Sequence, residues 1–451
     1  MELSDRLSDL AKLRLAPIIG LVACLPGAVP ALAQTAGLPP GAAPGAVLEQ
    51  VATLADTAER YALYLPSGYR ADRTWPVLYL LDPGGRALVP LRLFRPAAER
   101  YGYVILSSSN SRSDSTVDPT ARALAALFAE TERRYAAEVH RLYLAGFSGT
   151  ARQSWTAAYD YRDNVAGVMG FGAGLPYASF PALTRDTTVH FVFFGGAGLL
   201  DFNYDEVRAL DAALRAWDVP HRIRWYGGRH AWPPEEVCTA AVEWMELQAM
   251  RRGLAPRRVG FADSLSRRWL AEAQALESAG ELVEAEERYR AVMEDLNGLS
   301  DVSEAAAARE RLNRSPQLRR AVAALDQEGK RYQEYLERLE AFRQEVDRAA
   351  RPPALQDALR RLMIAKLLEQ SEARDTLTSL GARRLLENAL VRTGGDYPRE
   401  YLARSKPAQA LLMLDIAQAI RPEDAGRCRR RAQALTQMGK ATEAAGLACA
   451  P

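Results

Sequence analysis

The chain has 451 residues, of which 48% are hydrophobic and 25% charged, and its formal net charge is +2. This length predicts two or three domains, and the composition is that of a folded protein with sizeable cores. A nearly balanced charge excludes the broad basic field that attracts nucleic acid, so no nucleic-acid partner is expected.

The N-terminus has the pattern of an export signal over residues 1–33. Basic residues precede the apolar run 15–29, and the small residues 31–33 suit cleavage. We therefore expect a secreted or periplasmic protein. The sequence around Cys24 also resembles a lipoprotein signal, so two alternatives stay open. One is a lipid anchor at Cys24, which is the only membrane contact that we expect, and the other is an uncleaved segment.

Residues 34–46 are rich in Gly, Ala and Pro and are interpreted as a linker. From 47 to 253, apolar strand patterns alternate with helical ones. We expect strands over 60–65, 76–81, 103–107, 141–145, 165–171, 189–194 and 221–226, and helices over 119–135, 205–217 and 234–252. This alternation predicts an α/β domain whose mostly parallel sheet is covered on both faces.

A second linker is predicted over 254–261, and helix-forming residues dominate 262–451. Two stretches fit the spacing of tetratricopeptide helix pairs. They comprise Trp269, Ala273, Leu276, Gly280, Ala285 and Tyr289, and then Ala410, Leu414, Ala417, Pro422, Ala432, Leu435, Gly439 and Ala444. Long charged helices are expected between them, over 301–350. Because fewer than three clean repeats are visible, the prediction is an irregular all-α helical-repeat domain.

The four cysteines contain no CxxC pair, so no zinc or redox site is expected. Cys428 and Cys449 fall on neighbouring predicted helices, where a disulfide and two separate core residues are both open interpretations. Cys238 is predicted to be a buried helix residue. The glycines of 195–198 follow a strand without opening a phosphate-binding helix, so no cofactor is expected, and no metal site is visible.

One short stretch carries a chemical pattern. An apolar strand runs into Gly146-Phe147-Ser148-Gly149, and a helix-forming segment follows, which places a serine on a sharp strand-to-helix turn. Asp201 comes just after the strand predicted over 189–194, and His230 just after that over 221–226. Since the carboxyl ends of parallel strands meet at one edge, we expect Ser148, Asp201 and His230 to converge there.

A serine hydroxyl needs a base within hydrogen-bond reach, and the base needs to be oriented. We assign Ser148 as nucleophile, His230 as general base and then acid, and Asp201 as the carboxylate that orients the imidazole. The backbone N–H of Gly149 is the expected first oxyanion donor. Gly84 or Gly85 is the expected second donor, because the preceding Pro83 has no N–H.

Each assignment has a plain structural alternative. Ser148 is open to being the scaffold remnant of a catalytic site that has lost its activity, Asp201 to being a helix N-cap, and His230 to being a loop histidine packed on Trp232. The scarcity of histidine, with only four in the chain, favours the catalytic interpretation of His230.

Five residues are weaker candidates for substrate contact. Arg86 and Asn110 lie on loops at the expected catalytic edge. Arg152 either contacts a substrate carboxylate or solvates its helix, and we favour solvation. Trp155 and Trp232 either line a pocket or pack in the core.

These motifs resemble those of the α/β-hydrolase superfamily over roughly residues 46–253, and most closely the compact secreted esterases related to feruloyl esterases and polyhydroxyalkanoate depolymerases. The Gly-His-x-Trp-Pro pattern of those enzymes is similar to residues 228–233, with an extra Arg229. Asp82-Pro83 replaces the usual His-Gly, and Thr150 stands where the elbow usually has glycine.

The resemblance implies a serine hydrolase that cleaves carboxylic esters, small or polymeric, through an acyl-enzyme. A serine peptidase of the same fold and an inactive, hydrolase-like interaction protein stay open as alternatives. For the helical domain, the alternatives are binding a protein partner, capping the site and self-association.

Overall fold

The computed structural model describes residues 36–113, 118–175, 189–374, 376–447 and 449. The predicted export signal over 1–33 and Cys24, the possible lipid-anchor residue, lie outside the described residues.

The first part of the chain is built on one eight-stranded sheet with the order β1-β2-β4-β3-β5-β6-β7-β8. Its strands are β1 (Val47–Ala52), β2 (Arg60–Tyr64), β3 (Trp75–Leu81), β4 (Val104–Ser108), β5 (Ala137–Phe147), β6 (Val165–Phe171), β7 (Val192–Gly198) and β8 (His221–Tyr226). Strand β2 runs antiparallel to β1 and β4, whereas β4, β3 and β5 to β8 are mutually parallel. The predicted fold class, an α/β domain with a mostly parallel sheet, is confirmed.

Helices cover both faces of the sheet, as strands without an exposed side require. One face carries α2 (Leu88–Tyr101) and α7 (Glu235–Arg251), and the other carries α3 (Pro119–Arg134), α4 (Gly149–Asp160) and α6 (Tyr204–Ala216). Every residue of β3, β4, β6 and β7 is buried. The hydrophobic effect over two apolar layers therefore holds the sheet in place.

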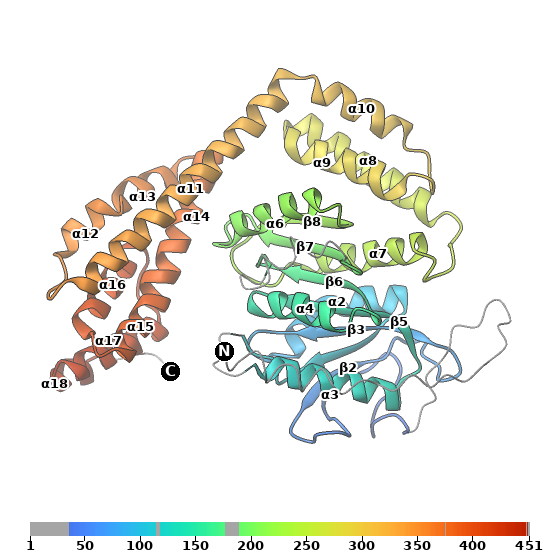
Figure 1. Cartoon of the computed structure of the whole chain (residues 1–451), viewed down its shortest axis with the longest axis horizontal. Coiled ribbons are helices and arrows are strands. Elements are labelled where there is room, and N and C mark those ends of the chain that lie inside the picture. Colours follow the sequence, from blue (N-terminus) through green and yellow to red (C-terminus); the bar gives the residue numbers. More distant parts are fainter. Residues whose placement is uncertain (1–35, 114–117, 176–188, 375, 448, 450–451) are drawn as a thin grey trace.

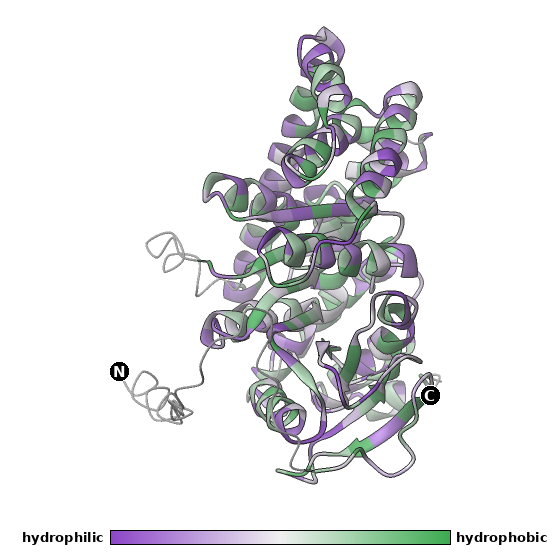
Figure 2. Ribbon diagram, turned by 90° about the vertical axis from the view of Figure 1, so that its right-hand side faces the viewer, coloured by the Kyte–Doolittle hydropathy of each residue, from purple (hydrophilic) through white to green (hydrophobic). Residues whose placement is uncertain are grey.

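The rest of the chain is helical. It contains α8 (Phe261–Ala279), α9 (Leu282–Leu296), α10 (Ser303–Asn313), α11 (Pro316–Arg348), α12 (Leu355–Arg361), α13 (Ile364–Glu372), α14 (Leu377–Val391), the π-helix η1 (Arg392–Asp396), α15 (Tyr397–Ala403), α16 (Pro407–Ile420), α17 (Ala425–Gln437) and α18 (Ala441–Ala445). Long α11 runs diagonally between two groups of helices in Figure 1. In Figure 2 the helices alternate between hydrophilic and hydrophobic colours, as amphipathic helices do.

The first helix pair lies where the spacing predicted it. Trp269, Ala273, Ala285 and Tyr289 are buried, and Gly280 ends α8 with a φ of 83°, which favours glycine. Since small residues sit where α8 meets α9, the two helices approach closely. Membership of the tetratricopeptide class stays a prediction.

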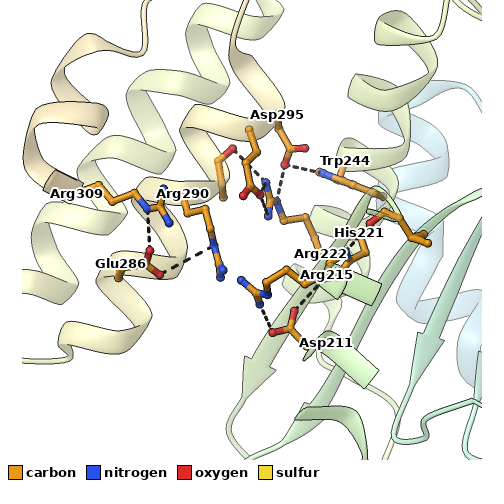
Figure 3. Close-up of polar contacts among 12 residues, drawn as sticks. Asp211, Arg215, His221, Arg222, Trp244, Glu286, Arg290, Asp295 and Arg309 are labelled. Carbon is orange, nitrogen blue, oxygen red and sulfur yellow. Dashed lines mark hydrogen bonds and ion pairs between the residues drawn. The ribbon is translucent and has the colours of Figure 1, made fainter. Parts of the chain in front are cut away.

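Helices α8–α10, called here the first bundle, share a hydrophobic core with the α/β part. Trp244 of α7 belongs to the same buried cluster as Trp269, Tyr289 and Leu312 of the first bundle. Asp295 of α9 is 5% exposed and links the first bundle to the α/β part (Figure 3). Its carboxylate accepts hydrogen bonds from Arg222, Trp244 and Gln248 at 2.5–2.9 Å. The core therefore continues across the predicted linker 254–261.

Helices α12–α18 and the C-terminal half of α11, called here the second bundle, have separate cores. Their two buried clusters contain no residue of the α/β part. The structure joins Cys428 and Cys449 in a disulfide with Cα atoms 5.6 Å apart, which resolves the two alternatives left open for this pair. Cys238 is fully buried in α7, as predicted.

Candidate active site

Ser148 lies at the turn between β5 and α4 with φ 55° and ψ −127°, a backbone conformation that non-glycine residues rarely adopt. Such strain persists only where the surroundings over-determine it. Here the Ser148 N–H donates to the carbonyl of Phe171 at 2.8 Å. The sequence thus builds the sharp strand-to-helix turn that the Gly-x-Ser-x-small pattern predicts.

Two neighbouring positions make this turn possible. A Cβ at Gly146 would overlap the backbone of Thr150, so only glycine fits there. The Thr150 hydroxyl lies 2.5 Å from the carbonyl oxygen of Leu81 and accepts a bond from the Phe147 N–H at 3.0 Å. The threonine that replaces the usual glycine therefore ties the elbow to the end of β3.

The structure brings the three predicted side chains together. Ser148 Oγ lies 2.9 Å from His230 Nε2, and His230 Nδ1 lies 2.9 and 3.0 Å from the two oxygens of Asp201. An ionised carboxylate only accepts, so the Nδ1–H donates to Asp201 and leaves Nε2 to accept the Ser148 hydroxyl proton. This tautomer is the one a serine nucleophile needs.

The loops that carry Asp201 and His230 are held against each other by their backbones. The Leu200 N–H donates to the carbonyl of Gly228 at 2.9 Å, and a Cβ at Gly198 would overlap that same carbonyl. Asp201 is fully buried. The N-cap of α6 is Asn203, so the alternative of Asp201 as the helix N-cap is wrong.

The imidazole of His230 lies between two aromatic rings. Its centroid is 4.6 Å from that of Phe147 and 4.2 Å from that of Phe202. Trp232 packs on Phe147 instead, with centroids 5.7 Å apart. The alternative of a histidine packed on Trp232 is therefore not what the structure shows.

The expected second oxyanion donor needs correction. The Gly84 N–H donates to Asp82 Oδ1 at 2.8 Å, and the Gly85 N–H donates to the Asp82 carbonyl at 3.0 Å. Both donors are thus engaged within their own turn. The prediction failed because Asp82, in the place of the usual histidine, folds this loop back onto itself.

Asp82 also links two loops of the site. Its buried carboxylate accepts from the Arg86 guanidinium at 2.9 and 3.0 Å and from Trp232 Nε1 at 2.9 Å. Burial alone would raise the pKa of Asp82, but the bonds from Arg86, Trp232 and backbone N–H groups outweigh it and hold the pKa below its usual range. Asp82 therefore stays ionised, and its bond from Trp232 ties the His230 loop to the end of β3.

Gly149 is the first residue of α4, so its N–H has no acceptor within that helix. A Cβ at this position would overlap the side chain of Ser113. The glycine thus lets Ser113 approach the elbow closely. This placement fits the predicted oxyanion role for Gly149.

The weaker substrate-contact candidates mostly have structural partners. The Asn110 amide joins the backbones of Arg60 and Ala58. Arg152, whose predicted solvation is wrong, pairs with both oxygens of Glu206 at 2.6 and 2.8 Å. Trp155 is 3% exposed and packs on Phe191 and Phe193, so it is a core residue.

Arg86 and Trp232 remain near the candidate site. Arg86 has a 61% exposed side chain at the rim and pairs with Asp82. Trp232 is half-buried against Phe94 and Phe147 and donates to the same carboxylate. Both residues organise the site in the structure, and contact with substrate stays a prediction.

The sequence analysis did not single out Asp82 and Phe202, which contact residues of the site, or three second-bundle residues that make contacts with the catalytic loops or with each other. The replacement of His-Gly by Asp82-Pro83 was a signal for the first, because an acid in a buried turn needs donors. The signal for Phe202 was its position directly after the assigned Asp201. The bundle residues, Tyr332, Glu387 and Asn388, carry no sequence signal, because they reach the site only through tertiary packing.

The described residues contain neither a metal-binding cluster nor a helix that could span a membrane. No group of three or more His, Cys, Asp or Glu side chains is arranged to hold a metal ion there. None of the helices within those ranges is long and apolar enough to cross a membrane.

The sheet topology and the Ser148–His230–Asp201 geometry define an α/β domain that carries a serine–histidine–aspartate triad arrangement. No protein-family model and no curated protein matches the sequence. Among solved structures, it is similar to FphF, a fluorophosphonate-binding serine hydrolase of Staphylococcus aureus, at 13% identity and TM-score 0.39, over 45% of this chain and 98% of that one.

Two more solved structures are similar to the same degree. One is the S-formylglutathione hydrolase FrmB of Staphylococcus aureus, with 12% identity and TM-score 0.35 over 42% of this chain and 90% of that one. The other is the feruloyl esterase module of Clostridium thermocellum, with 14% identity and TM-score 0.37 over 48% and 95%.

Proposed function

We propose that this chain is an exported serine hydrolase that cleaves carboxylic esters through an acyl-enzyme. The observation that carries the proposal is the unbroken chain of short contacts from Ser148 Oγ through the His230 imidazole to the buried Asp201 carboxylate. A strained serine aimed at an imidazole has no structural use, whereas a nucleophile needs both features.

In the first half-reaction, Ser148 Oγ attacks the ester carbonyl carbon while His230 Nε2 takes the hydroxyl proton. Asp201 stabilises the imidazolium that forms, and the Gly149 N–H donates to the developing oxyanion. When the tetrahedral intermediate collapses, the Nε2 proton passes to the leaving alkoxide. The alcohol departs, and the acyl group stays on Ser148.

In the second half-reaction, His230 Nε2 takes a proton from water, and the hydroxide attacks the acyl carbon. Collapse of this intermediate returns the proton from Nε2 to Ser148 Oγ and releases the acid. The two phenylalanines that flank His230 limit its ring rotation, so the same orientation serves both steps.

Export to an oxidising compartment is supported by the Cys428–Cys449 disulfide, because structural disulfides persist mainly outside the cytosol. The export signal in the sequence points the same way.

The test is labelling of the mature protein with a fluorophosphonate probe. We expect one labelled serine, lost in Ser148→Ala and retained in Ser154→Ala, a matched change on the same helix. Hydrolysis of aryl esters of graded acyl size, but not of peptide amides, then separates an esterase from a peptidase. Absence of labelling in folded wild-type protein would contradict the proposal and favour an inactive hydrolase fold.

A further inference from the structure

The loop that carries Asp201 is bonded to the second bundle. Tyr332 of α11 donates its hydroxyl to the backbone carbonyl of Phe202 at 2.5 Å, although the two residues are 130 positions apart. The ring of Phe202 lies on the imidazole of His230. A shift of this carbonyl therefore moves both the neighbour of Asp201 and the ring that flanks the base.

Tyr332 is itself held in place. It is 6% exposed, and its hydroxyl accepts a bond from Asn388 Nδ2 at 2.9 Å. Burial, together with the nearby Asp205, raises the pKa of Tyr332, so the phenol stays protonated and remains a donor. Asn388 lies on α14, so two helices of the second bundle fix this one hydroxyl.

A second contact reaches the other catalytic loop. Arg229, directly before His230, pairs with Glu387 of α14 at 2.7 Å. The Glu387 side chain is 13% exposed and also pairs with Arg421. Arg229 is the residue that departs from the esterase pattern, and the structure gives it a partner in the second bundle.

A third contact lies between these two. Arg384 of α14 is 3% exposed, lies 4.1 Å from the ring centroid of Tyr204, and donates to the carbonyl of Leu199 at 3.4 Å. The segment from 199 to 204 is thus contacted by α14 at both its ends and by α11 at Phe202 between them. In Figure 1 these two helices lie beside α6, which this segment leads into.

We propose that the second bundle completes the catalytic site, with Tyr332 and Glu387 as positioning residues that hold the Asp201 and His230 loops in register with Ser148. The inference rests on the proposed function and deepens it. It assigns the helical region a role in the chemical step itself, in addition to any binding of a partner. Neither side chain touches the reacting atoms; both act through Phe202, Arg229 and the imidazole.

The first test is Tyr332→Phe in the full-length mature protein, which removes only the hydroxyl. Small misplacements of a catalytic group lower rates by roughly 10- to 100-fold. We expect kcat for an aryl ester and the rate of fluorophosphonate labelling to fall about tenfold together, with KM changed less than about twofold. The matched control is Tyr335→Phe on the same helix, whose buried hydroxyl has no hydrogen-bond partner among the described residues.

The second test is a double-mutant cycle of Arg229→Gln and Glu387→Gln. If the pair positions His230, each single variant lowers kcat and the double variant lowers it no further. Glu345→Gln is the control, since it breaks an exposed ion pair with Arg361 far from the α/β part. Should Tyr332→Phe fail to fold, this cycle decides the proposal alone.

The outcomes separate the two proposals. If wild-type protein is neither labelled nor active, the proposed function fails. If wild-type protein is labelled and active, but Tyr332→Phe and the cycle leave kcat within twofold while only the melting temperature changes, the bundle merely docks and the inference is overturned.

Discussion

The two helical bundles meet the α/β part in different ways. The first bundle joins it through a continuous apolar core, with buried acids such as Asp295 and Glu243 paired across the seam. The second bundle has its own cores and meets the catalytic loops through hydrogen bonds and ion pairs. Apolar burial is non-directional and fixes the fold, whereas polar contacts are directional and fix geometry. The first therefore serves folding, and the second serves orientation.

Cutting the chain at two places should give the largest difference between the bundles. A chain ending at Pro256 exposes Trp244, Leu247 and their neighbours on α7, and each fully buried side chain is worth about 1.5–3 kcal/mol. Exposing several of them costs an amount comparable with a typical net stability of about 5–15 kcal/mol, so this chain should not unfold cooperatively in urea.

A chain ending at Gln327 keeps the first bundle and Leu318 but loses Tyr332 and α14. It should unfold cooperatively and react slowly with a fluorophosphonate. A soluble, cooperatively folded chain ending at Pro256 would contradict the shared core.

The seam of the first bundle should respond strongly to Asp295→Ala. Removing the carboxylate leaves the buried donors of Trp244 and Gln248 without an acceptor, and leaves Arg222 paired only with the 55% exposed Glu294, which should cost about 3 kcal/mol. The free energy of unfolding from urea titration checks this. Glu345→Gln in the second bundle breaks an exposed pair and should cost less than about 1 kcal/mol. Equal losses in the free energy of unfolding for Asp295→Ala and Glu345→Gln would contradict the difference drawn between the two bundles.

A carboxyl group in the first bundle should make stability depend on pH. Burial, with Asp211 and Glu284 nearby, raises the pKa of Glu287 to about 7. An unfolded glutamic acid titrates near pH ~4.3, so the folded state holds the proton more tightly. The stability from this proton is fully present below that pH and is lost as pH rises through 7.

Glu287→Gln should therefore be more stable than wild type at pH 8 by on the order of 2 kcal/mol, and not at pH 4. Thermal or urea unfolding at both values measures this. The exposed Glu337→Gln is the control. A wild-type advantage at pH 8 would show that Glu287 is charged and well compensated.

Salt should produce the smallest effect, and only through the second bundle. The Debye length falls from about 10 Å at 0.1 M to about 3 Å at 1 M, which screens the half-exposed Arg229–Glu387 pair. We expect kcat to fall less than about threefold over this range in wild type. It should not fall in the Arg229→Gln/Glu387→Gln double variant. If kcat fell equally with salt in wild type and in the double variant, the salt effect would not come from the Arg229–Glu387 pair.

Much of the α/β part was predictable because its strands are unbroken apolar runs. The strands predicted over 165–171 and 221–226 match β6 and β8 to the residue. Strand β1 escaped prediction because Glu49 and Gln50 face solvent and a bulge disturbs its alternation. Helix α2 escaped because Pro96 lies within it, where sequence rules expect a break.

The candidate triad was predictable because each member follows a strand, and topology alone then brings the three together. The state of the Gly84 and Gly85 donors was not, since it depends on how Asp82 folds its turn. The contacts of Tyr332 and Glu387 depend on where α11 and α14 lie in space. Periodicity identifies the buried face of such a helix, but not the loop that it reaches.

The backbone of Ser148 carries a wider consequence. A conformation with φ 55° and ψ −127° costs a non-glycine residue about 1–3 kcal/mol, and glycine would adopt it freely. The molecule thus retains, at its most constrained turn, a residue that thermodynamics alone would replace. The Ser148 hydroxyl is therefore retained at a cost to the stability of the fold. Substitutions that raise the melting temperature should lie away from this turn, and those within the turn should lower kcat.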